Sequence, residues 1–222
     1  MQINSYAKIN LGLHVLNARE DGFHNIATIF QELNFCDQIT IKESPKMSFD
    51  TNVDWLDRTN NTCIKAVKIL QNHYSGLPNF KIFLQKNIPT NAGLGGGSSN
   101  GTATLKAINQ LCGLNIQEKE MKKFAEKISA DSTFFVNGGL QGGEQKGEKL
   151  YPIKYSAIDA YILLVMPNIK VQTSDAFMFI KKYLVKGKTD IKLSQMLEEF
   201  KLNKLSSELF YNDFEMHVFK TH

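Results

Sequence analysis

The chain has 222 residues, of which 42% are hydrophobic and 22% are charged. This length and composition support one large or two small domains with a buried core, and exclude a disordered, collagen-like or coiled-coil chain. The 26 Lys and Arg residues exceed the 22 Asp and Glu residues by only four, and no run of five like charges occurs. A dedicated nucleic-acid-binding arm is therefore not expected.

The cysteines and the amino terminus predict where the protein resides. Cys36, Cys63 and Cys112 are odd in number and far apart, so they predict neither a disulfide framework nor a CxxC metal site. Residues 1–8 contain no apolar targeting segment, and no apolar stretch of 18 residues occurs anywhere. We therefore expect a cytoplasmic protein that neither enters a membrane nor is secreted. No feature of the sequence indicates an oligomeric state.

The amino-terminal half contains both strand and helix patterns. Apolar and polar residues alternate over 7–16, which predicts a strand with one apolar face, and a polar turn follows at 17–22. Helical spacing of apolar residues predicts a helix over 61–74 with Asn60 or Asn61 as its cap. The other strands expected in this half are 26–35, 38–41 and 80–84, the first two separated by a bend near Asp37.

The remainder of the chain is predicted to be of the same mixed type. A glycine-rich loop at 89–97 leads into helical patterns, and a second glycine-rich stretch at 138–147 is a candidate hinge between two halves. The helices expected are 98–112, 118–128, 175–184 and 192–201, and the buried strands expected are 134–136 and 162–166. The pattern alone therefore predicts a mixed α and β fold.

The glycine-rich loop is the sharpest chemical signal. Four glycines fall within the five residues 93–97, directly before a predicted helix that Ser98 or Ser99 can cap. The start of such a helix offers unpaired N–H groups and a positive dipole end to an anion such as phosphate. The loop lacks the Lys of GxxxxGK[ST] and the third Gly of GxGxxG, which excludes both of those phosphate-binding motifs. The competing interpretation is a flexible loop with a good helix cap.

Residues 89–103 resemble the ATP-phosphate loop of the GHMP superfamily, which includes galactokinase, homoserine kinase, mevalonate kinase and phosphomevalonate kinase. Within that superfamily, the chain is most similar to the 4-diphosphocytidyl-2-C-methyl-D-erythritol kinase family. Four further segments resemble this family in the same order along the chain, namely 7–11, 21–25, 129–135 and 167–177.

The resemblance implies an α+β, two-domain GHMP-kinase fold. Residues 1–148 would form the ATP-binding domain, similar to domain 2 of ribosomal protein S5, and residues 149–222 an incomplete ferredoxin-like domain. Residues 211–215 resemble the start of a family helix that further strands and a glycine loop normally follow, whereas no glycine occurs after Gly187. We therefore expect the sequence to be a truncated form of a longer kinase.

The resemblance implies that Lys8 and Asp131 are catalytic. Asp131 would accept the proton of the substrate hydroxyl, and Lys8 would lie beside it and stabilise charge. Without the resemblance, Lys8 would be interpreted as a solvated residue on the face of a strand, and Asp131 as the cap of a helix or turn. The chain has Ser129 before the Ala-Asp pair, where the family has Gly, and Ser132-Thr133 after it, where the family has Val-Pro. The backbone around Asp131 is therefore expected to differ from the family pattern.

The resemblance also assigns residues to the ATP site and to the substrate site. The residues that would bind ATP are Asn61, Lys86, Pro89, Asn91, Ala92, Gly93, Leu94, Gly95, Gly96, Gly97, Ser98 and Ser99. Mg²⁺ would accompany ATP, with the hydroxyl of Ser98 or Ser99 as a candidate ligand. The residues that would bind the cytidine substrate are Asn10, Phe23, His24, Thr173 and Phe177. In this group Phe23 replaces the tyrosine of the family, which keeps a stacking ring and loses its hydroxyl.

The function implied is ATP-dependent phosphorylation of the 2-hydroxyl of 4-diphosphocytidyl-2-C-methyl-D-erythritol, a step of non-mevalonate isoprenoid biosynthesis. The partner would be a small molecule that carries a cytidine diphosphate group, with neither a nucleic acid nor a membrane involved. One alternative is another small-molecule kinase of the superfamily, which would show no preference for cytidine. The others are a truncated, catalytically weak nucleotide-binding chain and an RNA-binding module, which would leave the glycine loop unexplained.

Overall fold

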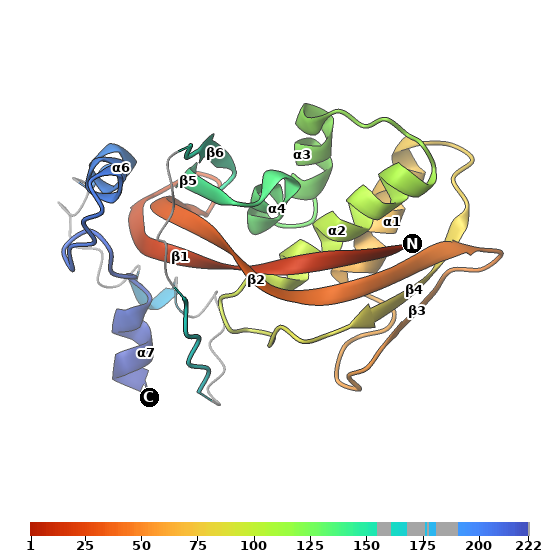
Figure 1. Ribbon diagram of the computed structural model, residues 1–222, viewed down its shortest axis with the longest axis horizontal. Helices are drawn as coiled ribbons and strands as arrows, with labels where there is room; N and C mark the ends of the chain where they lie inside the picture. The colour runs from red at the N-terminus through yellow and green to blue at the C-terminus, as the bar shows by residue number, and fades with distance from the viewer. Residues whose placement is uncertain (155–160, 168–175, 177, 181–190, 222) are drawn as a thin grey trace. The chain divides into compact units, whose positions relative to one another are not determined.

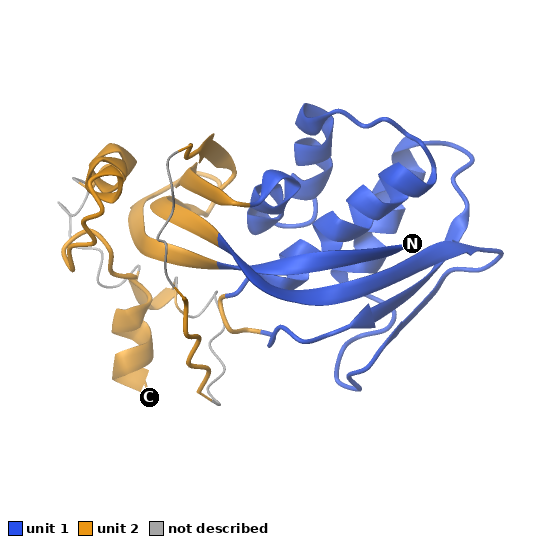
Figure 2. Cartoon of the chain, in the orientation of Figure 1, with its two compact units in different colours: residues 1–8, 32–90, 94–138 blue, residues 9–31, 91–93, 139–222 orange. Residues whose placement is uncertain are grey.

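The computed structural model describes residues 1–154, 161–167, 176, 178–180 and 191–221. The chain forms two compact units that interleave along the sequence (Figure 2). Unit 1 comprises residues 1–8, 32–90 and 94–138, and unit 2 comprises residues 9–31, 91–93 and 139–222. Two long strands, β1 (Gln2–Ala18) and β2 (His24–Ser44), contribute residues to both units. The expected domains, 1–148 and 149–222, stay a prediction.

The sheet of unit 1 is built on the second half of β2 (Figure 1). Strand β4 (Asn79–Gln85) pairs antiparallel with β2, with Ile41 opposite Ile82, and β3 (Ser48–Thr51) pairs parallel with β4. Inward-facing residues of β4 are buried and outward-facing ones are exposed, as period-two side-chain placement requires. The first strand joins this sheet through reciprocal hydrogen bonds between Met1 and Ile41, each 2.9 Å long.

Three helices cover the buried face of this sheet. They are α1 (Thr62–His73), α2 (Gly96–Leu111) and α3 (Glu118–Glu126). Their apolar residues form one continuous core with those of the strands, and Leu70, Ile82 and Ile108 are each fully buried in it. Burial of this apolar face is the main term that stabilises unit 1. None of the helices in the described part of the chain combines the length and hydropathy needed to cross a membrane.

Unit 2 contains a smaller sheet and core. Strand β5 (Leu140–Gln145) pairs antiparallel with the first half of β2, and β6 (Lys149–Pro152) pairs with β5. Helix α6 (Leu193–Lys201) contributes Leu193, Met196 and Phe200 to a core with Ala27 and Ile29.

The carboxy-terminal segment of unit 2 is hydrogen-bonded to the first strand before α7 (Glu215–Thr221) begins. The N–H of Leu13 donates to the carbonyl of Tyr211, and the N–H of Asp213 donates to the carbonyl of Leu13. The buried carboxylate of Asp213 accepts a 2.7 Å hydrogen bond from the N–H of Val15. These bonds fix the segment along β1 of the same unit.

Most long periodic segments are confirmed, whereas a short apolar one is not. The expected strand at 134–136 is wrong, because a 3₁₀ turn, η1 (Ala130–Thr133), continues into the helix α4 (Phe134–Asn137). The boundary between the two units at Gly138 and Gly139 falls inside the candidate hinge at 138–147, although most of that stretch forms β5. A hinge motion there stays a prediction. A short buried apolar run fits a strand and a helix equally well, so its period does not decide between them.

Two further expectations need correction. Strand β2 is continuous, so the expected separation of 26–35 from 38–41 by a bend near Asp37 is wrong. Residues 162–166 form no strand, and most of their side chains are exposed. A strand needs a neighbour to satisfy its N–H and C=O groups, and no described strand pairs with this segment. Most of the helix expected at 175–184 lies outside the described residues.

The core of unit 1 makes a direct stability prediction. Replacing Ile82, which is 0% exposed, by Ala should lower the free energy of unfolding by about 2–5 kcal/mol because it leaves a cavity. Phe83→Ala is the matched control, since Phe83 faces outward on the same strand and is 38% exposed. Urea denaturation would measure both changes. Equal losses for the two variants would contradict the assignment of the buried face.

Candidate active site

The glycine-rich loop ends where α2 begins, two residues earlier than expected. The helix starts at Gly96, and its N-cap is Gly95, which adopts a left-handed conformation with φ of 67°. Neither Ser98 nor Ser99 is the cap, so that part of the prediction is wrong. No acidic residue lies in the first turn. The start of α2 therefore offers N–H groups and the positive end of its dipole to an anion.

Two glycines of the loop are required by close packing in unit 1. A Cβ atom at Gly95 would lie 2.8 Å from Cζ of Phe135 and 3.1 Å from Cγ of Lys8. A Cβ atom at Gly96 would lie 2.9 Å from both Nζ of Lys86 and Cγ2 of Ile88. The absence of side chains thus lets the start of α2 approach β1 and the residues after β4 closely.

Lys8 and Asp131 lie together in unit 1, as the resemblance implied. Nζ of Lys8 is 3.6 Å from Oδ2 of Asp131, and the N–H of Lys8 donates a 3.0 Å hydrogen bond to the carbonyl of Leu94 in the loop. The Lys8 side chain is 7% exposed, whereas that of Asp131, which lies on η1, is 38% exposed. The carboxylate is therefore open to a ligand, while the bond to the loop holds the backbone of Lys8 in place and the Lys8 side chain is nearly buried.

The departures from the family pattern around Asp131 form a hydroxyl cluster. Oγ of Ser129 donates a 2.7 Å hydrogen bond to Oγ of Ser98 and lies 2.7 Å from Oγ of Ser132. Oγ1 of Thr102 donates to the carbonyl of Ser132 over 2.9 Å. These bonds connect the segment that carries Asp131 to the first turns of α2.

The two candidate serines differ in their surroundings. Ser99 is only 2% exposed, and its hydroxyl accepts a 2.8 Å hydrogen bond from Oγ of Ser5. Ser98 is half-buried and bonds with Ser129. The Ser98 hydroxyl is therefore the more accessible of the two to a phosphate or a metal ion.

Asn61 is the cap of α1. Its Oδ1 accepts hydrogen bonds from the N–H groups of Cys63 (3.0 Å) and Ile64 (3.1 Å), which decides between Asn60 and Asn61. Thr62, the next residue, donates a 2.7 Å hydrogen bond to the carbonyl of Gly97, so the cap adjoins the glycine loop. A contact between Asn61 and adenine stays a prediction.

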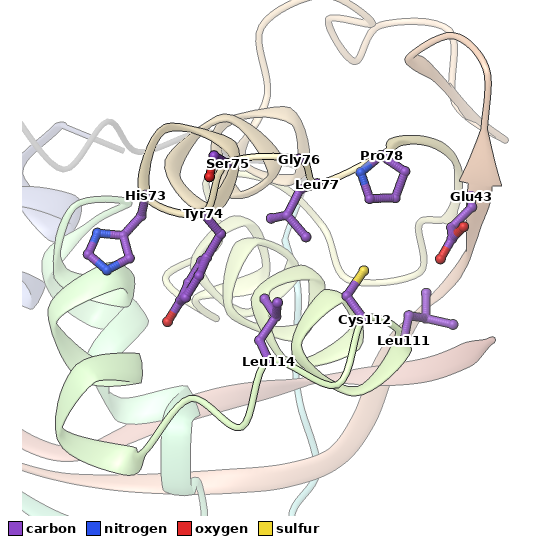
Figure 3. Close-up of a pocket in the computed structure, with 10 residues that line it drawn as sticks. All are labelled: Glu43, His73, Tyr74, Ser75, Gly76, Leu77, Pro78, Leu111, Cys112 and Leu114. Atoms are coloured by element: carbon purple, nitrogen blue, oxygen red, sulfur yellow. The ribbon is translucent and has the colours of Figure 1, made fainter.

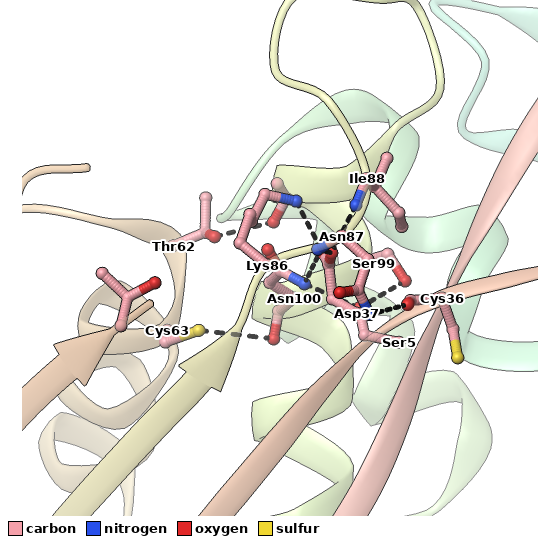
Figure 4. Close-up of polar contacts among 12 residues, drawn as sticks. Ser5, Cys36, Asp37, Thr62, Cys63, Lys86, Asn87, Ile88, Ser99 and Asn100 are labelled. Carbon is pink, nitrogen blue, oxygen red and sulfur yellow. Dashed lines mark hydrogen bonds and ion pairs between the residues drawn. The ribbon is translucent and has the colours of Figure 1, made fainter. Parts of the chain in front are cut away.

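Lys86 does not extend into solvent. Its side chain is 3% exposed, and its ammonium group forms an ion pair with Asp37, whose side chain is fully buried (Figure 4). Lys86 is therefore a buried residue, and its contact with ATP stays a prediction. Sequence reasoning missed Asp37, although it lies two residues before Ile39 and four before Ile41 on the inward face of β2.

The residues expected at the cytidine end lie in unit 2. Nδ2 of Asn10 donates a 2.8 Å hydrogen bond to Oγ1 of Thr28. The ring of Phe23 is 56% exposed and has Nζ of Lys146 at 5.3 Å from its centroid, a cation–π arrangement, whereas His24 is buried. Asn91, Ala92 and Gly93 of the loop also belong to this unit. The expected contacts Thr173 and Phe177 lie outside the described residues.

A separate hollow of about 750 Å³ lies in unit 1, between the end of α1 and the end of α2 (Figure 3). Its lining includes His73, Tyr74 and Cys112, and none of the expected site residues contributes to it. Its size alone therefore does not connect it with the candidate active site.

The loop geometry predicts which glycine tolerates a side chain. Gly95→Ala should lower the free energy of unfolding by about 1–3 kcal/mol, because it combines a positive φ with a clash against Phe135. Gly97→Ala is the matched control, since a Cβ there meets nothing within 4 Å. Thermal unfolding would measure both. A destabilisation of Gly97→Ala as large as that of Gly95→Ala would contradict this geometry.

Comparison with known proteins identifies a matching family and proteins of similar fold. The family described as "GHMP kinases N terminal domain" matches residues 61–139, which include the glycine loop and Asp131. A solved structure of 4-(cytidine 5'-diphospho)-2C-methyl-D-erythritol kinase is similar in fold, with a TM-score of 0.74 and 23% identity, over 100% of this chain and 78% of that one. The mevalonate kinase of Methanococcus jannaschii is similar with a TM-score of 0.63 and 17% identity, over 96% and 74% of the two chains.

Two curated relatives are more similar in sequence. The 4-diphosphocytidyl-2-C-methyl-D-erythritol kinase of Sulfurihydrogenibium sp. is 33% identical over 204 residues, which cover 91% of this chain and 74% of that protein. The enzyme of the same name from Persephonella marina is 35% identical over 200 residues, which cover 89% and 73%. At this identity and coverage, the chain belongs to the 4-diphosphocytidyl-2-C-methyl-D-erythritol kinase family of the GHMP kinases.

Proposed function

We propose that the chain transfers the γ-phosphoryl group of ATP to the 2-hydroxyl of 4-diphosphocytidyl-2-C-methyl-D-erythritol. The observation that carries this proposal is the Lys8–Asp131 pair, 3.6 Å apart and beside Gly95 at the start of α2. An accessible carboxylate, a nearly buried cation beside it and a helix start suit phosphoryl transfer, which depends mainly on positioning and charge neutralisation. The names of the relatives support this acceptor.

In this mechanism Asp131 acts as the base. As the substrate oxygen forms its bond to the γ-phosphorus, the bond from that phosphorus to the bridging oxygen breaks and ADP leaves, while the hydroxyl proton passes to the Asp131 carboxylate. Lys8 lies close enough to pair with that carboxylate and to offset charge on the transferring group. The first turn of α2 would bind the phosphate chain through its N–H groups.

Mg²⁺ fits this donor set as a partner of ATP. The described residues hold no cluster of three His, Cys, Asp or Glu side chains that would form a cage for a metal. Mg²⁺ needs no such cage, because it usually binds through one or two protein oxygens, substrate phosphates and waters. We assign the Ser98 hydroxyl to this role rather than that of Ser99, which is buried and engaged by Ser5. When bound, the ion would neutralise phosphate charge.

The cytidine end is proposed to lie at the turn that precedes β2. Phe23 presents an exposed ring for stacking, and the turn before it is held by Asp21, whose carboxylate accepts hydrogen bonds from Arg19 and from the N–H of Phe23. Desolvation raises the pKa of Asp21, but these hydrogen bonds and the neighbouring positive charges of Arg19 and Lys146 together outweigh it and lower the pKa. His24 would read the edge of the base, with Asn10, Thr173 and Phe177 as further contacts.

A reducing, cytoplasmic setting is part of the proposal. All three cysteines are free thiols, although Cys36 and Cys112 are only partly buried. Burial raises the pKa of Cys63 to about 11, so this thiol stays protonated and unreactive at neutral pH.

The substrate proposal is tested by coupled measurement of ADP release. We expect turnover with the cytidine substrate, competitive inhibition by CDP against that substrate, and turnover of mevalonate or homoserine about a hundredfold lower or less, since these lack the group that Phe23 would stack on. Equal turnover of mevalonate or homoserine would favour the alternative, another small-molecule kinase of the GHMP superfamily.

The base assignment makes a second kinetic prediction. Asp131→Asn should lower kcat by about 10²–10⁴-fold while changing KM for ATP only slightly, because it removes the proton acceptor and keeps the shape of the side chain. Asp54→Asn is the matched control, since Asp54 is a fully exposed acid of the same unit. Near-normal turnover of Asp131→Asn would refute the role of Asp131.

A further inference from the structure

We infer that Asp37, which no motif singled out, is a positioning residue for the glycine-rich loop. The inference rests on the proposed function, since it assigns to Asp37 the task of holding the loop in the form that binds the phosphates of ATP. Asp37 itself is 0% exposed and would not contact the nucleotide.

The Asp37 carboxylate is fully occupied by groups from two other elements (Figure 4). Its Oδ1 accepts hydrogen bonds from the N–H groups of Asn87 (2.7 Å) and Ile88 (2.8 Å), directly before the loop. Its Oδ2 accepts a 2.8 Å hydrogen bond from Nδ2 of Asn100 on α2 and pairs with the ammonium group of Lys86. One carboxylate therefore fixes the chain on both sides of the loop.

The network continues to the first turns of α2. Nδ2 of Asn100 also donates a 2.9 Å hydrogen bond to Oγ of Ser5, and that hydroxyl donates to Oγ of Ser99 over 2.8 Å. The groups that Asp37 holds are also the loop's close neighbours, since Nζ of Lys86 and Cγ2 of Ile88 are the atoms nearest to a Cβ at Gly96. A shift of the Asp37 carboxylate would therefore allow Lys86 and Ile88, against which Gly96 packs, to move.

The energetics favour a positioning role over a purely stabilising one. Burying an ion pair costs desolvation free energy, and an apolar pair of the same size often stabilises a core as well or better. What an apolar pair does not supply is directional bonds to two backbone N–H groups and an amide. Such bonds fix the orientation of the backbone, which binding to phosphate through N–H groups requires.

Two variants separate the charge from the shape. Asp37→Asn keeps an oxygen for Asn87 and Ile88, but it turns an NH₂ group toward two other donors, Lys86 and Asn100. Ser5→Ala removes only the hydroxyl that joins Asn100 to Ser99, so it perturbs the same network mildly. Asp50→Asn is the matched control, since Asp50 forms an exposed ion pair with Arg58 in the same unit.

The experiment combines kinetics with hydrogen exchange, both well below the unfolding temperature. For Asp37→Asn we expect KM for ATP to rise about tenfold or more while KM for the cytidine substrate stays within about twofold. Backbone amides of residues 94–99 should exchange about tenfold faster, with those of 66–70 in α1 unchanged. Ser5→Ala should show smaller changes of both kinds in the same direction, and Asp50→Asn should show neither.

The possible negative outcomes contradict either the inference about Asp37 or the proposed function, and they can be told apart. Uniformly faster exchange in unit 1, or a lower kcat with KM for ATP unchanged, would mean that Asp37 only stabilises the core and would overturn the inference. If Asp37→Asn does not fold, unchanged loop exchange in Ser5→Ala would overturn it in the same way. An inactive wild-type chain would count against the proposed function instead, while the exchange of the loop would still test Asp37.

Discussion

The candidate site depends on how closely the backbone at Gly95 and Gly96 approaches its neighbours. Both positions lack room for a side chain, because Phe135 and Lys8 fill the space at one and Lys86 and Ile88 fill it at the other. This approach lets α2 start directly beside Lys8 of β1, since a Cβ atom at its N-cap, Gly95, would lie 3.1 Å from Cγ of Lys8. The anion binding proposed for the helix start and the proton transfer proposed for the carboxylate would thereby depend on one packing arrangement.

Two Lys–Asp pairs flank this arrangement, and solvent access gives them different tasks. Asp131 is 38% exposed and can meet a substrate hydroxyl, whereas Asp37 is sealed in the core and can only hold neighbouring groups. The chemical groups are identical in the two pairs. Burial therefore separates the group proposed to react from the group proposed to position.

The sequence allowed prediction of the elements with long periods and of the loop itself. Helix α1, helix α6 and strand β4 follow from spacing, because their apolar faces are long enough to define a period, whereas the cap of α1 was left open between Asn60 and Asn61. The strand predicted at 134–136 was wrong, because three apolar residues are too few to define a period. Asp37 was missed because its pairing with Lys86 joins positions 49 residues apart, which local patterns do not contain.

The hydrogen bond between Ser129 and Ser98 determines which hydroxyl of the pair can donate to a ligand of the loop. Ser129 donates its hydroxyl proton to Oγ of Ser98, so Ser98 acts as the acceptor in that bond. The hydroxyl proton of Ser98 therefore stays available for another hydrogen bond. A hydroxyl in this state is a ready donor to a phosphate oxygen and keeps a second lone pair for a metal ion. Ser129, which departs from the family pattern, thus leaves the hydroxyl of Ser98 free to donate.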